Sequence, residues 1–517
     1  MTERSRSLTA AENAQEPEFR RRAKIVCTLG PASSSEEQIR QLLLLGMDVA
    51  RLNFSHGSHE EHLERIRILR KVAASLGRTV CILQDLQGPK IRTGALRGHV
   101  PVNLLPGSCL TITNRAVEGT AEVLGTTFKT LAHEAEVGSR ILLSDGRLSL
   151  KVLKVQGGDV VCEVVDGGML GEHQGINLPG AVLSTPSLTR KDKKDLAFGL
   201  SAKVDAVAIS FVRSAADIRA VKKIIAAAGE CTPVIAKLEK PQAIENLEEI
   251  LEVADGVMVA RGDLGVEVAP EKVPIIQKRV IRRAMHWRKP VITATQMLDS
   301  MMHNPRPTRA EASDVANAIY DGTDAVMLSG ETASGDYPRE ALSMMSRIVT
   351  ETEADIRKMN APPRRELRQL TIPQAICESV AHVAEELNMR GIAVFTATGN
   401  TAGLIAKYRP RAEVYAFSHV PEVCNRLNLY WGVRPVSIHA PHSVEAMIDA
   451  AEAELRRAQV VQVDDVVAIV AGTRMGTTGS TNFIRLHRIR PAEQSRRRMA
   501  KPKSLSKKSS TPKDSPQ

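Results

Sequence analysis

Aromatic residues are scarce in this sequence. Phe, Trp and Tyr make up 3% of the 517 residues, against 43% hydrophobic residues in total. The cores must therefore be aliphatic, which disfavours proteins that bind nucleic acid by stacking bases on aromatic side chains. The chain is too long for one ordinary domain of about 150 residues, although a β/α barrel takes about 250 residues by itself.

Paired cysteines and long apolar segments are also missing. The seven cysteines stand singly and in odd number, without a CxxC motif. This pattern excludes a disulfide framework and a zinc ribbon, and it is typical of a reducing cytoplasm. No run approaches the ~18 apolar residues of a membrane span, and the polar start of the chain contains no apolar signal core. We therefore expect a cytoplasmic protein with no membrane partner.

The formal charge of +11 is concentrated at one end of the sequence. Residues 491–517 contain eight Lys or Arg and two acidic residues, a net charge of +6, so the other 490 residues carry +5. A strongly basic body would indicate nucleic acid, whereas this body suits small anionic substrates equally well. We expect a flexible leader over residues 1–20, a basic disordered tail over 491–517 and no nucleic-acid partner.

Short apolar runs of the buried-strand type alternate with amphipathic helical stretches. Such runs predict parallel strands covered by helices, and eight of them predict a closed (β/α)8 TIM barrel over residues 21–94 and 182–355. The eight runs are 23–29, 47–54, 78–86, 204–212, 232–239, 254–263, 289–296 and 324–331.

Two further domains are expected beside the barrel. Residues 95–181 carry short alternating segments among glycine-rich turns, which predict an inserted all-β domain, a β-barrel lid. A second αβ pattern begins near Thr371. It predicts an open, mostly parallel C-terminal α/β domain, a regulatory domain over residues 356–490, with an uncertain edge.

Polar residues follow the predicted barrel strands, at the end where β/α barrels carry their active sites. Lys237 and Glu239 are two apart on one strand and face the same way, and Asp263 follows the next strand. Two carboxylates with water and substrate oxygens are what Mg²⁺ prefers. A neighbouring lysine can neutralise the charge of a transferring phosphoryl group. The guanidinium groups of Arg51 and Arg92 can each bind a phosphate through two N–H groups. The sequence therefore predicts a divalent-metal site for phosphoryl transfer.

Each of these groups also has an ordinary structural interpretation. A Lys-x-Glu pair on a strand is most often a salt-bridged surface pair, and Arg-Gly-Asp at 261–263 is common in turns. The hydroxyl of Thr295 could simply satisfy backbone groups. Convergence of complementary groups from separate strands on one rim favours the functional interpretation.

Longer motifs carry a family resemblance. Over about residues 22–488 the chain resembles the pyruvate kinase family, and matches of this length in this order are highly specific. The matching stretches are RLNFSHGSHEEH (51–62), GPKIRTG (88–94), ISFVR (209–213), IAKLE (235–239), MVARGDLGVE (258–267), ATQMLDSM (294–301), the run from NPRPTRAEASD to SGDYP (304–338) and AKYRP (406–410).

The resemblance implies that phosphoenolpyruvate passes its phosphoryl group to ADP, giving pyruvate and ATP in the last step of glycolysis. The catalytic residues would be Lys237, Thr295 and Arg51, and the substrate site Arg51, Lys237, Gly262, Asp263, Thr295 and Ser329, with Glu331 behind it. Glu239 and Asp263 would hold Mg²⁺, with Mn²⁺ as an alternative. Asn53, His56 and Arg92 would line the nucleotide side. The insert would be a lid that excludes water, and the chain would form a homotetramer.

Two departures from the family pattern matter. Many members need potassium and carry Asp-Thr-Lys-Gly-Pro-Glu where this chain has Asp85-Leu86-Gln87-Gly88-Pro89-Lys90. The resemblance implies that members with Leu, Gln and Lys there do not need the ion, and the Lys90 ammonium can supply its charge. We expect potassium-independent activity, although the ion ligands Asn53, Ser55 and Asp85 remain. His173-Gln174 replace a lysine usual in the lid, which puts the tightness of the nucleotide contact in doubt.

A loop in the C-terminal domain is a candidate effector site. It lies between a predicted strand and a helix start, where backbone N–H groups and hydroxyls suit a phosphate. A plain strand–helix turn with an N-cap is the alternative. The resemblance implies a phosphorylated small-molecule effector, whose identity the sequence does not give, and a covering loop at 472–479. The candidate residues are Thr396, Thr398, Gly399, Asn400 and Thr401.

Two rival functions remain at this point. One is a binding or regulatory protein with a decayed enzyme core, and the presence of Arg51, Lys237, Glu239, Asp263 and Thr295 argues against it. The other is a different barrel enzyme that uses phosphoenolpyruvate. The inserted β domain and the C-terminal domain favour pyruvate kinase over that alternative.

Overall fold

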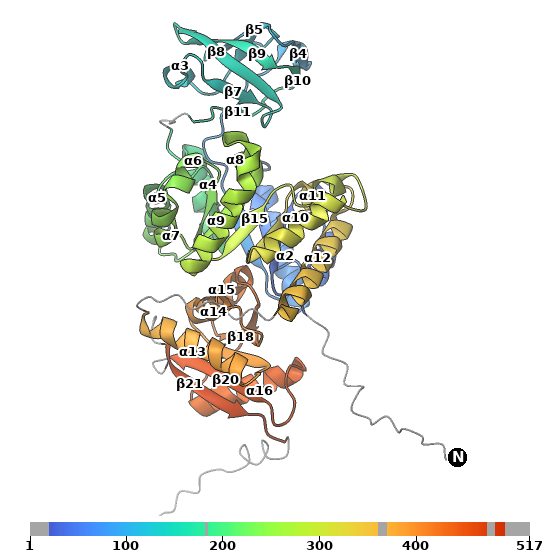
Figure 1. Cartoon of the computed structure of the whole chain (residues 1–517), viewed down its shortest axis with the longest axis vertical. Coiled ribbons are helices and arrows are strands. Elements are labelled where there is room, and N and C mark those ends of the chain that lie inside the picture. Colours follow the sequence, from blue (N-terminus) through green and yellow to red (C-terminus); the bar gives the residue numbers. More distant parts are fainter. Residues whose placement is uncertain (1–19, 181–184, 360–369, 473–480, 492–517) are drawn as a thin grey trace, which may run out of the picture.

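The computed structural model describes residues 20–180, 185–359, 370–472 and 481–491. The leader and tail lie outside these residues apart from Arg20 and Pro491, and so does the predicted covering loop apart from Gly472. Three units are stacked along the long axis, with the β-rich insert at the top, the barrel in the middle and the C-terminal domain below (Figure 1).

The central unit is the predicted closed barrel. Its eight parallel strands are ordered β1-β16-β15-β14-β13-β12-β3-β2. Nearly every strand residue is buried, which explains the continuous apolar runs in the sequence. The strands are β1 (Lys24–Leu29), β2 (Val49–Asn53), β3 (Cys81–Asp85), β12 (Ala206–Ile209), β13 (Val234–Leu238), β14 (Gly256–Ala260), β15 (Val291–Ala294) and β16 (Ala325–Leu328).

Helices surround the barrel and alternate with its strands, so the fold prediction is confirmed. Several begin at capping boxes, such as Ser58 with Glu61 and Thr308 with Glu311. No helix of the described residues is long and apolar enough to cross a membrane. The helices are α1 (Glu36–Leu45), α2 (His59–Ser75), α4 (Arg190–Ser201), α5 (Ala215–Ala227), α6 (Pro241–Glu245), α7 (Leu247–Val253), α8 (Arg261–Glu267), α9 (Val273–His286), α10 (Arg309–Tyr320), α11 (Gly330–Ala333) and α12 (Pro338–Lys358).

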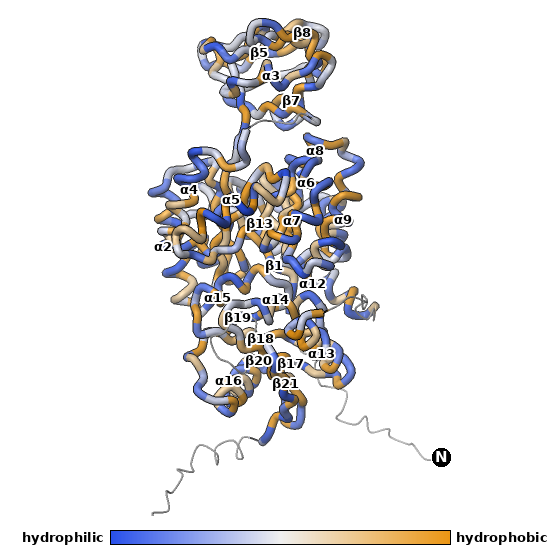
Figure 2. Tube along the Cα trace, turned by 90° about the vertical axis from the view of Figure 1, so that its left-hand side faces the viewer, coloured by the Kyte–Doolittle hydropathy of each residue, from blue (hydrophilic) through white to orange (hydrophobic). Residues whose placement is uncertain are grey.

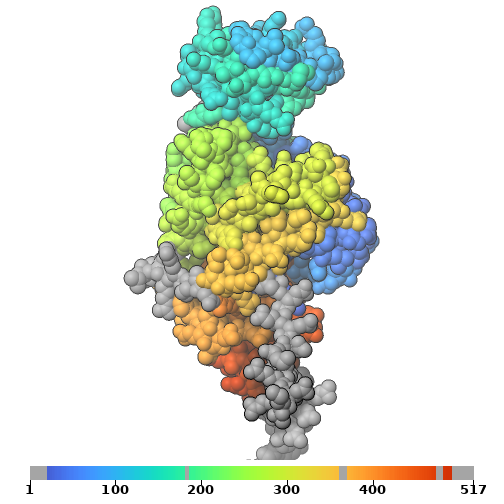
Figure 3. Space-filling view, turned by 45° about the vertical axis from the view of Figure 1, so that its right-hand side comes forward, coloured from blue at the N-terminus to red at the C-terminus, as the bar shows by residue number. Residues whose placement is uncertain are grey.

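The insert stands as a separate body on the barrel (Figure 3). It has an aliphatic core of its own, which includes Leu110, Leu150 and Val160. Strand pairing gives a six-stranded sheet, β11-β7-β8-β9-β5-β6, and a ribbon of β10 with β4, so this β-rich lid consists of two open sheets and not of one closed barrel. Its elements are β4 (Val102–Leu104), β5 (Cys109–Thr113), β6 (Val123–Gly125), the short helix α3 (Leu131–Glu134), β7 (Arg140–Leu143), β8 (Leu148–Gln156), β9 (Asp159–Asp166), β10 (Gly168–Leu170) and β11 (Ile176–Asn177).

The C-terminal unit is the predicted open α/β domain. Its five-stranded sheet is ordered β19-β18-β17-β20-β21, and the edge strand β21 is antiparallel to β20. This strand settles the edge that the sequence left open. The elements are α13 (Ile372–Glu386), β17 (Gly391–Phe395), α14 (Asn400–Ala406), β18 (Glu413–Ser418), α15 (Pro421–Arg426), the 3-10 turn η5 (Leu427–Leu429), β19 (Val433–Ser437), α16 (Val444–Arg457), β20 (Val466–Gly472) and β21 (Thr481–Arg488).

The C-terminal domain closes the N-terminal mouth of the barrel. Leu429 and Tyr430 pack into the apolar cluster that fills the barrel interior, and Figure 2 shows how hydrophobic residues gather inside the stacked units. Asp324 lies directly before β16, and it pairs with Lys407 and, at 3.2 Å, with Arg409. These ionic and apolar contacts fix the domain against the barrel.

Removal of the buried carboxylate at this interface tests how firmly the two domains are joined. Asp324 is 1% exposed, so Asp324→Ala leaves the buried Lys407 without its carboxylate and weakens the hold on the partly buried Arg409, and it is expected to cost roughly 3–5 kcal/mol of stability. The measurement is the midpoint of urea unfolding. As a control, Asp159→Ala removes the partly exposed partner of the exposed Arg115 in the lid and should cost less than about 1 kcal/mol. Equal midpoints for the two variants would contradict the prediction.

Candidate active site

Lys237 is the centre of a chain of charged groups at the carboxyl ends of the barrel strands. Its Nζ donates to Ser210 Oγ at 2.7 Å and lies 2.8 Å from Glu239 Oε1 and 3.3 Å from Asp85 Oδ1. Asp85 Oδ2 in turn accepts a 2.7 Å hydrogen bond from Arg51 Nε. The predicted convergence of Arg51, Lys237 and Glu239 on one rim is present, and these are buried groups and not a surface salt bridge.

Burial and pairing set the charges of this chain. Burial lowers the pKa of Lys237, but Asp85 and Glu239 outweigh that effect and raise the pKa above its ordinary value. Burial also raises the pKa of Asp85, but Lys237 and Arg51 more than compensate, and the pKa lies below its ordinary value. A positive lysine and a negative aspartate are therefore held in place at neutral pH.

Glu239 and Asp263 supply more negative charge than the site neutralises. Burial raises the pKa of Glu239, and the nearby carboxylate of Asp263 raises it further. Asp263 lies in the first turn of α8 and makes no hydrogen bond or ion pair with any described residue. Arg51 and Lys237 thus face three carboxylates, which leaves one excess negative charge.

This donor set fits a divalent cation that keeps part of its ligand shell. Among the described residues, no three His, Cys, Asp or Glu side chains form a group suited to a metal ion. The chain thus offers two carboxylates, from Glu239 and Asp263, and leaves the other positions to water and substrate oxygens. Mg²⁺ is commonly bound in this way.

Thr295 is held rigidly beside α8. Its backbone lies in the left-handed region (φ 68°), and the buried Arg261 donates to the Thr295 carbonyl at 2.7 Å. Its Oγ1 accepts a 2.7 Å hydrogen bond from the Gly262 N–H. Arg261 follows an apolar strand run in the sequence, but no pattern there indicates a role for it. The structure makes it the residue that positions Thr295.

Ser329 and Glu331 lie at the end of β16. The Glu331 carboxylate accepts hydrogen bonds from the backbone N–H groups of Ser329 at 2.7 Å and Leu298 at 3.1 Å. Burial raises the pKa of Glu331. The buried Ser329 Oγ has no hydrogen-bond partner in the described part of the chain. An unsatisfied hydroxyl beside the site suits a bound substrate or an ordered water.

Several cationic side chains lie around His56. Burial lowers the pKa of His56, and Arg92 and Lys90 lower it further. Arg92 reaches into the lid, where it donates to the His173 carbonyl at 2.9 Å. The charge of Lys191 also lowers the pKa of His56, and Lys191 forms an ion pair with Asp195 at 2.6 Å. Lys191 could not be selected from the sequence by its place at a strand end, because it lies on the helix α4.

The residues predicted for the monovalent-cation region do not all line the same place in the structure. Asn53 and Asp85 are neighbours across β2 and β3, and Asn53 Oδ1 accepts the Ser55 N–H at 3.1 Å. Leu86 follows β3 and is buried. Lys90 instead lines a small cleft under the lid.

The turn that carries Lys90 requires glycine at position 88. Gly88 has φ +70°, and a Cβ there would lie 2.7 Å from the Phe211 ring. The cleft beyond this turn also contains Asp145, Lys240 and Asp263. Lys90 therefore lies between the lid and the metal side of the site, and Asp85 is neutralised by Arg51 and Lys237.

The lid contacts the barrel beside α8. Asn177 of β11 donates to Glu267 at 2.9 Å, and Glu267 pairs with Lys240 at 2.6 Å. Arg92 forms an isolated bridge with Gly175, so the chain enters and leaves the lid side by side. The lid therefore stands directly over the charged strand ends.

The five residues of the predicted effector loop face two ways. Thr396 Oγ1 accepts the Gly399 N–H at 2.9 Å, and Thr401 Oγ1 lies 2.7 Å from Thr481 Oγ1 on β21. Thr398, Gly399 and Asn400 instead line a cavity against the barrel. One loop thus has a surface inside its own domain and a surface on the domain boundary.

Comparisons with known proteins agree with this architecture. Residues 20–342 match the family model of the pyruvate kinase barrel domain, and residues 374–487 match that of the pyruvate kinase alpha/beta domain. Pyruvate kinases of Staphylococcus aureus (strain MRSA252) and Staphylococcus saprophyticus are 46% identical over 91% of this chain and 80% of theirs. The crystal structure of a pyruvate kinase from Cryptosporidium parvum superposes with a TM-score of 0.84 at 36% identity, covering 91% of this chain and 96% of that one.

Proposed function

The chain belongs to the pyruvate kinase family and catalyses the transfer of a phosphoryl group from phosphoenolpyruvate to ADP, and we propose which residues carry this reaction. The observation that carries the proposal is the position of Lys237, which is held between Asp85 and Glu239 near Asp263, a carboxylate that pairs with no described residue. A fixed positive charge beside a cation site is what phosphoryl transfer requires, because catalysis there consists of positioning and charge stabilisation.

The phosphoryl side of the site is formed by two cations and two carboxylates. Arg51 and Lys237 bind the phosphate oxygens, and Lys237 stabilises the phosphoryl group as it leaves the enol oxygen. Glu239 and Asp263 would hold Mg²⁺, or Mn²⁺ as an alternative, and the ion would supply positive charge that offsets their excess negative charge and stabilises the charge of the phosphoryl group. The Arg51–Asp85 and Lys237–Ser210 hydrogen bonds keep both cations oriented.

The opposite wall delivers the proton that completes the reaction. Once the phosphoryl group has left, the enolate carbon must gain a proton to become pyruvate. Thr295 Oγ1 donates to the Ala294 carbonyl at 2.6 Å and accepts from Gly262, so its hydroxyl is oriented before substrate binds. Ser329 and Glu331 extend this polar path behind the substrate.

The nucleotide lies on the side of Asn53, His56 and Arg92. These groups lie next to Lys90 and Lys191, and together the cations suit the phosphates of ADP. The lid stands above them and excludes water, so that the phosphoryl group reaches ADP and not the solvent. His173 and Gln174 supply no fixed positive charge there, which weakens the lid's contact with the nucleotide.

A pyruvate assay tests the reaction directly. Pyruvate formation is followed with phosphoenolpyruvate, ADP and Mg²⁺ together and then with each omitted in turn. We expect formation only with all three. Pyruvate released without ADP would indicate a phosphatase, and another barrel enzyme that uses phosphoenolpyruvate would give a different product.

Activity without potassium is the prediction for Lys90. With K⁺ replaced by tetramethylammonium at constant ionic strength, the rate should stay within about tenfold, because fixed side-chain ammonium groups supply the positive charge. Lys90→Glu restores the residue of potassium-dependent relatives, and this variant should regain a requirement for K⁺. Lys129→Glu, an exposed lid residue, is the control. A loss of tenfold or more in the unmodified protein would contradict the prediction.

Regulation and assembly complete the proposal. The loop that contains Thr396, Thr398, Gly399, Asn400 and Thr401 binds the phosphate of a small effector on one of its two surfaces, with hydroxyls and backbone N–H groups as donors. The chain assembles as a homotetramer, whose mass can be measured by light scattering. What supports the effector site is the loop's position between β17 and α14 at a domain boundary.

A further inference from the structure

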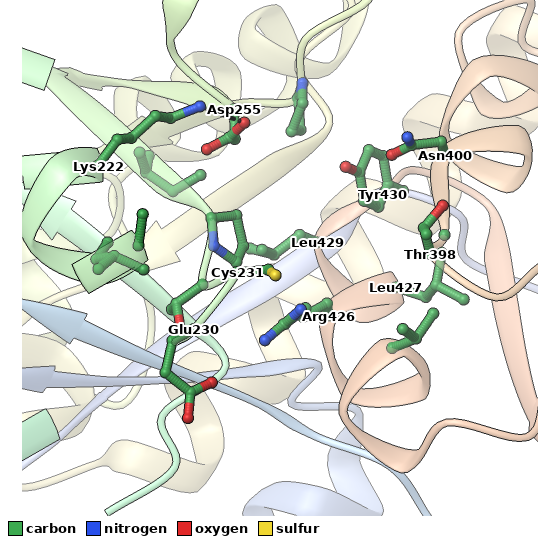
Figure 4. A pocket seen from close by; sticks show the side chains of 18 residues that line it. Lys222, Glu230, Cys231, Asp255, Thr398, Asn400, Arg426, Leu427, Leu429 and Tyr430 are labelled. Carbon is green, nitrogen blue, oxygen red and sulfur yellow. Dashed lines mark hydrogen bonds and ion pairs between the residues drawn. The ribbon is translucent and has the colours of Figure 1, made fainter. Parts of the chain in front are cut away.

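A cavity of about 360 Å³ lies between the N-terminal mouth of the barrel and the C-terminal domain (Figure 4). The barrel wall comes from the end of α5, the connection to β13 and the residues before β14 and β15. The other wall comes from the start of α14, from α15 and from η5. Its position is therefore opposite to the charged strand ends that carry the reaction.

The charges around this cavity leave one cation unmatched. Lys222 pairs with Asp255 at 2.7 Å, and Glu230 pairs with Lys203 at 2.6 Å. Arg426 makes no hydrogen bond or ion pair with any residue that the structure describes, and its Nε is buried. A partly buried guanidinium without a partner is costly, so an anion from outside the chain is the natural ligand.

The remaining walls of the cavity combine apolar and hydrogen-bonding groups. Pro233, Val423 and Leu427 provide the apolar surface, and Thr398 and Asn400 add a hydroxyl and an amide. Figure 4 shows Arg426 extending from the C-terminal domain toward Cys231 on the barrel side. Small-molecule sites usually have this character, with apolar walls and a few polar groups in a volume of about 300–1,000 Å³.

We propose that this cavity binds a small organic anion. Its carboxylate or phosphate group pairs with Arg426, and its apolar body rests against Pro233 and Leu427. Because the two walls belong to different domains, such a ligand contacts both of them at once.

The position of the cavity links it to the catalytic strand. Ile235 lines the cavity and belongs to the cluster inside the barrel. Ile235, Lys237 and Glu239 alternate on one face of β13 and its end, and Ile235 lies roughly 7 Å from Lys237 along the strand. A ligand at this place therefore touches the strand that carries the active-site lysine. This part of the inference rests on the proposed function.

The cysteines of the chain allow a test with the unmodified protein. Two of the seven are exposed, Cys231 at the cavity and Cys109 in the lid. Alkylation by iodoacetamide is followed at each by mass spectrometry, with phenyl phosphate as the probe. Saturating phenyl phosphate should slow alkylation of Cys231 at least about tenfold and leave Cys109 unchanged. Phenol and inorganic phosphate, which each carry half of the recognised chemistry, should protect less. Equal Cys231 rates with and without phenyl phosphate would overturn the site.

A pair of variants tests the role of the guanidinium. Arg426→Met keeps an unbranched side-chain stem but removes the guanidinium, and it should abolish protection of Cys231. Arg67→Met makes the same change at an exposed arginine on α2 and should retain it. Unfolding temperatures show whether both variants fold. Full protection in a folded Arg426→Met protein would overturn the assignment of Arg426.

Kinetics test the link to the reaction separately. Saturating phenyl phosphate should shift the half-saturating concentration of phosphoenolpyruvate at least about twofold, and the shift should vanish in Arg426→Met. Protection of Cys231 without this shift would overturn the coupling through β13 but not the binding site. A protein that protects Cys231 but forms no pyruvate would instead refute the proposed function.

Discussion

Replacing Lys237 with methionine is expected to lower kcat about 10³-fold, because the variant removes the positive charge that stabilises the phosphoryl group in flight. The substitution keeps an unbranched side chain that is one atom shorter than lysine. It also leaves Asp85 and Glu239 facing each other without their shared cation, so the protein should lose stability as well. The measurement is the steady-state rate of pyruvate formation at saturating phosphoenolpyruvate, ADP and Mg²⁺.

The control for this variant lies at the opposite end of the barrel. Lys24 is also a buried lysine on a barrel strand, and its Nζ donates to the Val433 carbonyl at 2.8 Å. Lys24→Met should lower stability and leave kcat within about threefold, since the residue is remote from the strand ends that carry the site. If Lys237→Met kept kcat within about tenfold of the unmodified protein, the role of Lys237 would be refuted.

Lys24 lies at the start of its strand and Lys237 near the end of its strand, and this difference shows why much of the candidate site could be predicted from the sequence. In a parallel barrel every strand points the same way, so the residue that follows each apolar run must lie on one rim. This rule selected Lys237, Glu239, Asp263 and Thr295 as candidates, and the parallel barrel brings the ends of their strands to one rim. The rule needs only the strand ends and the direction of the strands, and both are visible in the hydrophobic pattern.

The partners of these side chains could not be predicted in the same way. Ser210, which accepts a hydrogen bond from Lys237, and Phe211, whose N–H donates to Glu239 at 2.8 Å, both follow the neighbouring strand β12, which ends at Ile209. Phe211 reaches Glu239 through a left-handed backbone (φ 56°), which no pattern in the sequence reveals. The position of Lys90 likewise depends on the Gly88 turn and on the ring that packs against it. Such contacts arise from packing between strands.

Contacts at the edges of domains could not be predicted from the sequence either. The C-terminal sheet was visible in its apolar strands, but β21 reads TNFIRLHR and mixes polar and apolar residues. Such an edge strand is specified by its pairing with β20 and not by its own composition. The insertion of Leu429 and Tyr430 into the barrel mouth also escaped the sequence analysis, because each residue fits equally well in the core of its own domain.

Glu239→Gln is expected to lower the rate about 10²-fold or more at any Mg²⁺ concentration, because the site loses one of the two carboxylates that the chain offers to the ion. Glutamine keeps the shape of the side chain and an oxygen that accepts the Phe211 N–H, so the fold should be preserved. Its neutral amide cannot offset the charge of a divalent cation. The measurements are pyruvate formation and binding of Mn²⁺, followed by the relaxation of water protons.

A second buried carboxylate distinguishes this effect from a general loss of stability. Glu353 on α12 accepts the Trp431 indole N–H at 2.8 Å and the Ala23 N–H at 2.8 Å, so Glu353→Gln removes a structural charge at the domain interface. This variant should unfold at a lower temperature, yet bind Mn²⁺ as the unmodified protein does. The two substitutions should therefore have different effects. Glu239→Gln should lose Mn²⁺ binding, and Glu353→Gln should lose stability. Unchanged Mn²⁺ binding in Glu239→Gln would refute the metal assignment, because Asp263 would then be the sole carboxylate at the ion.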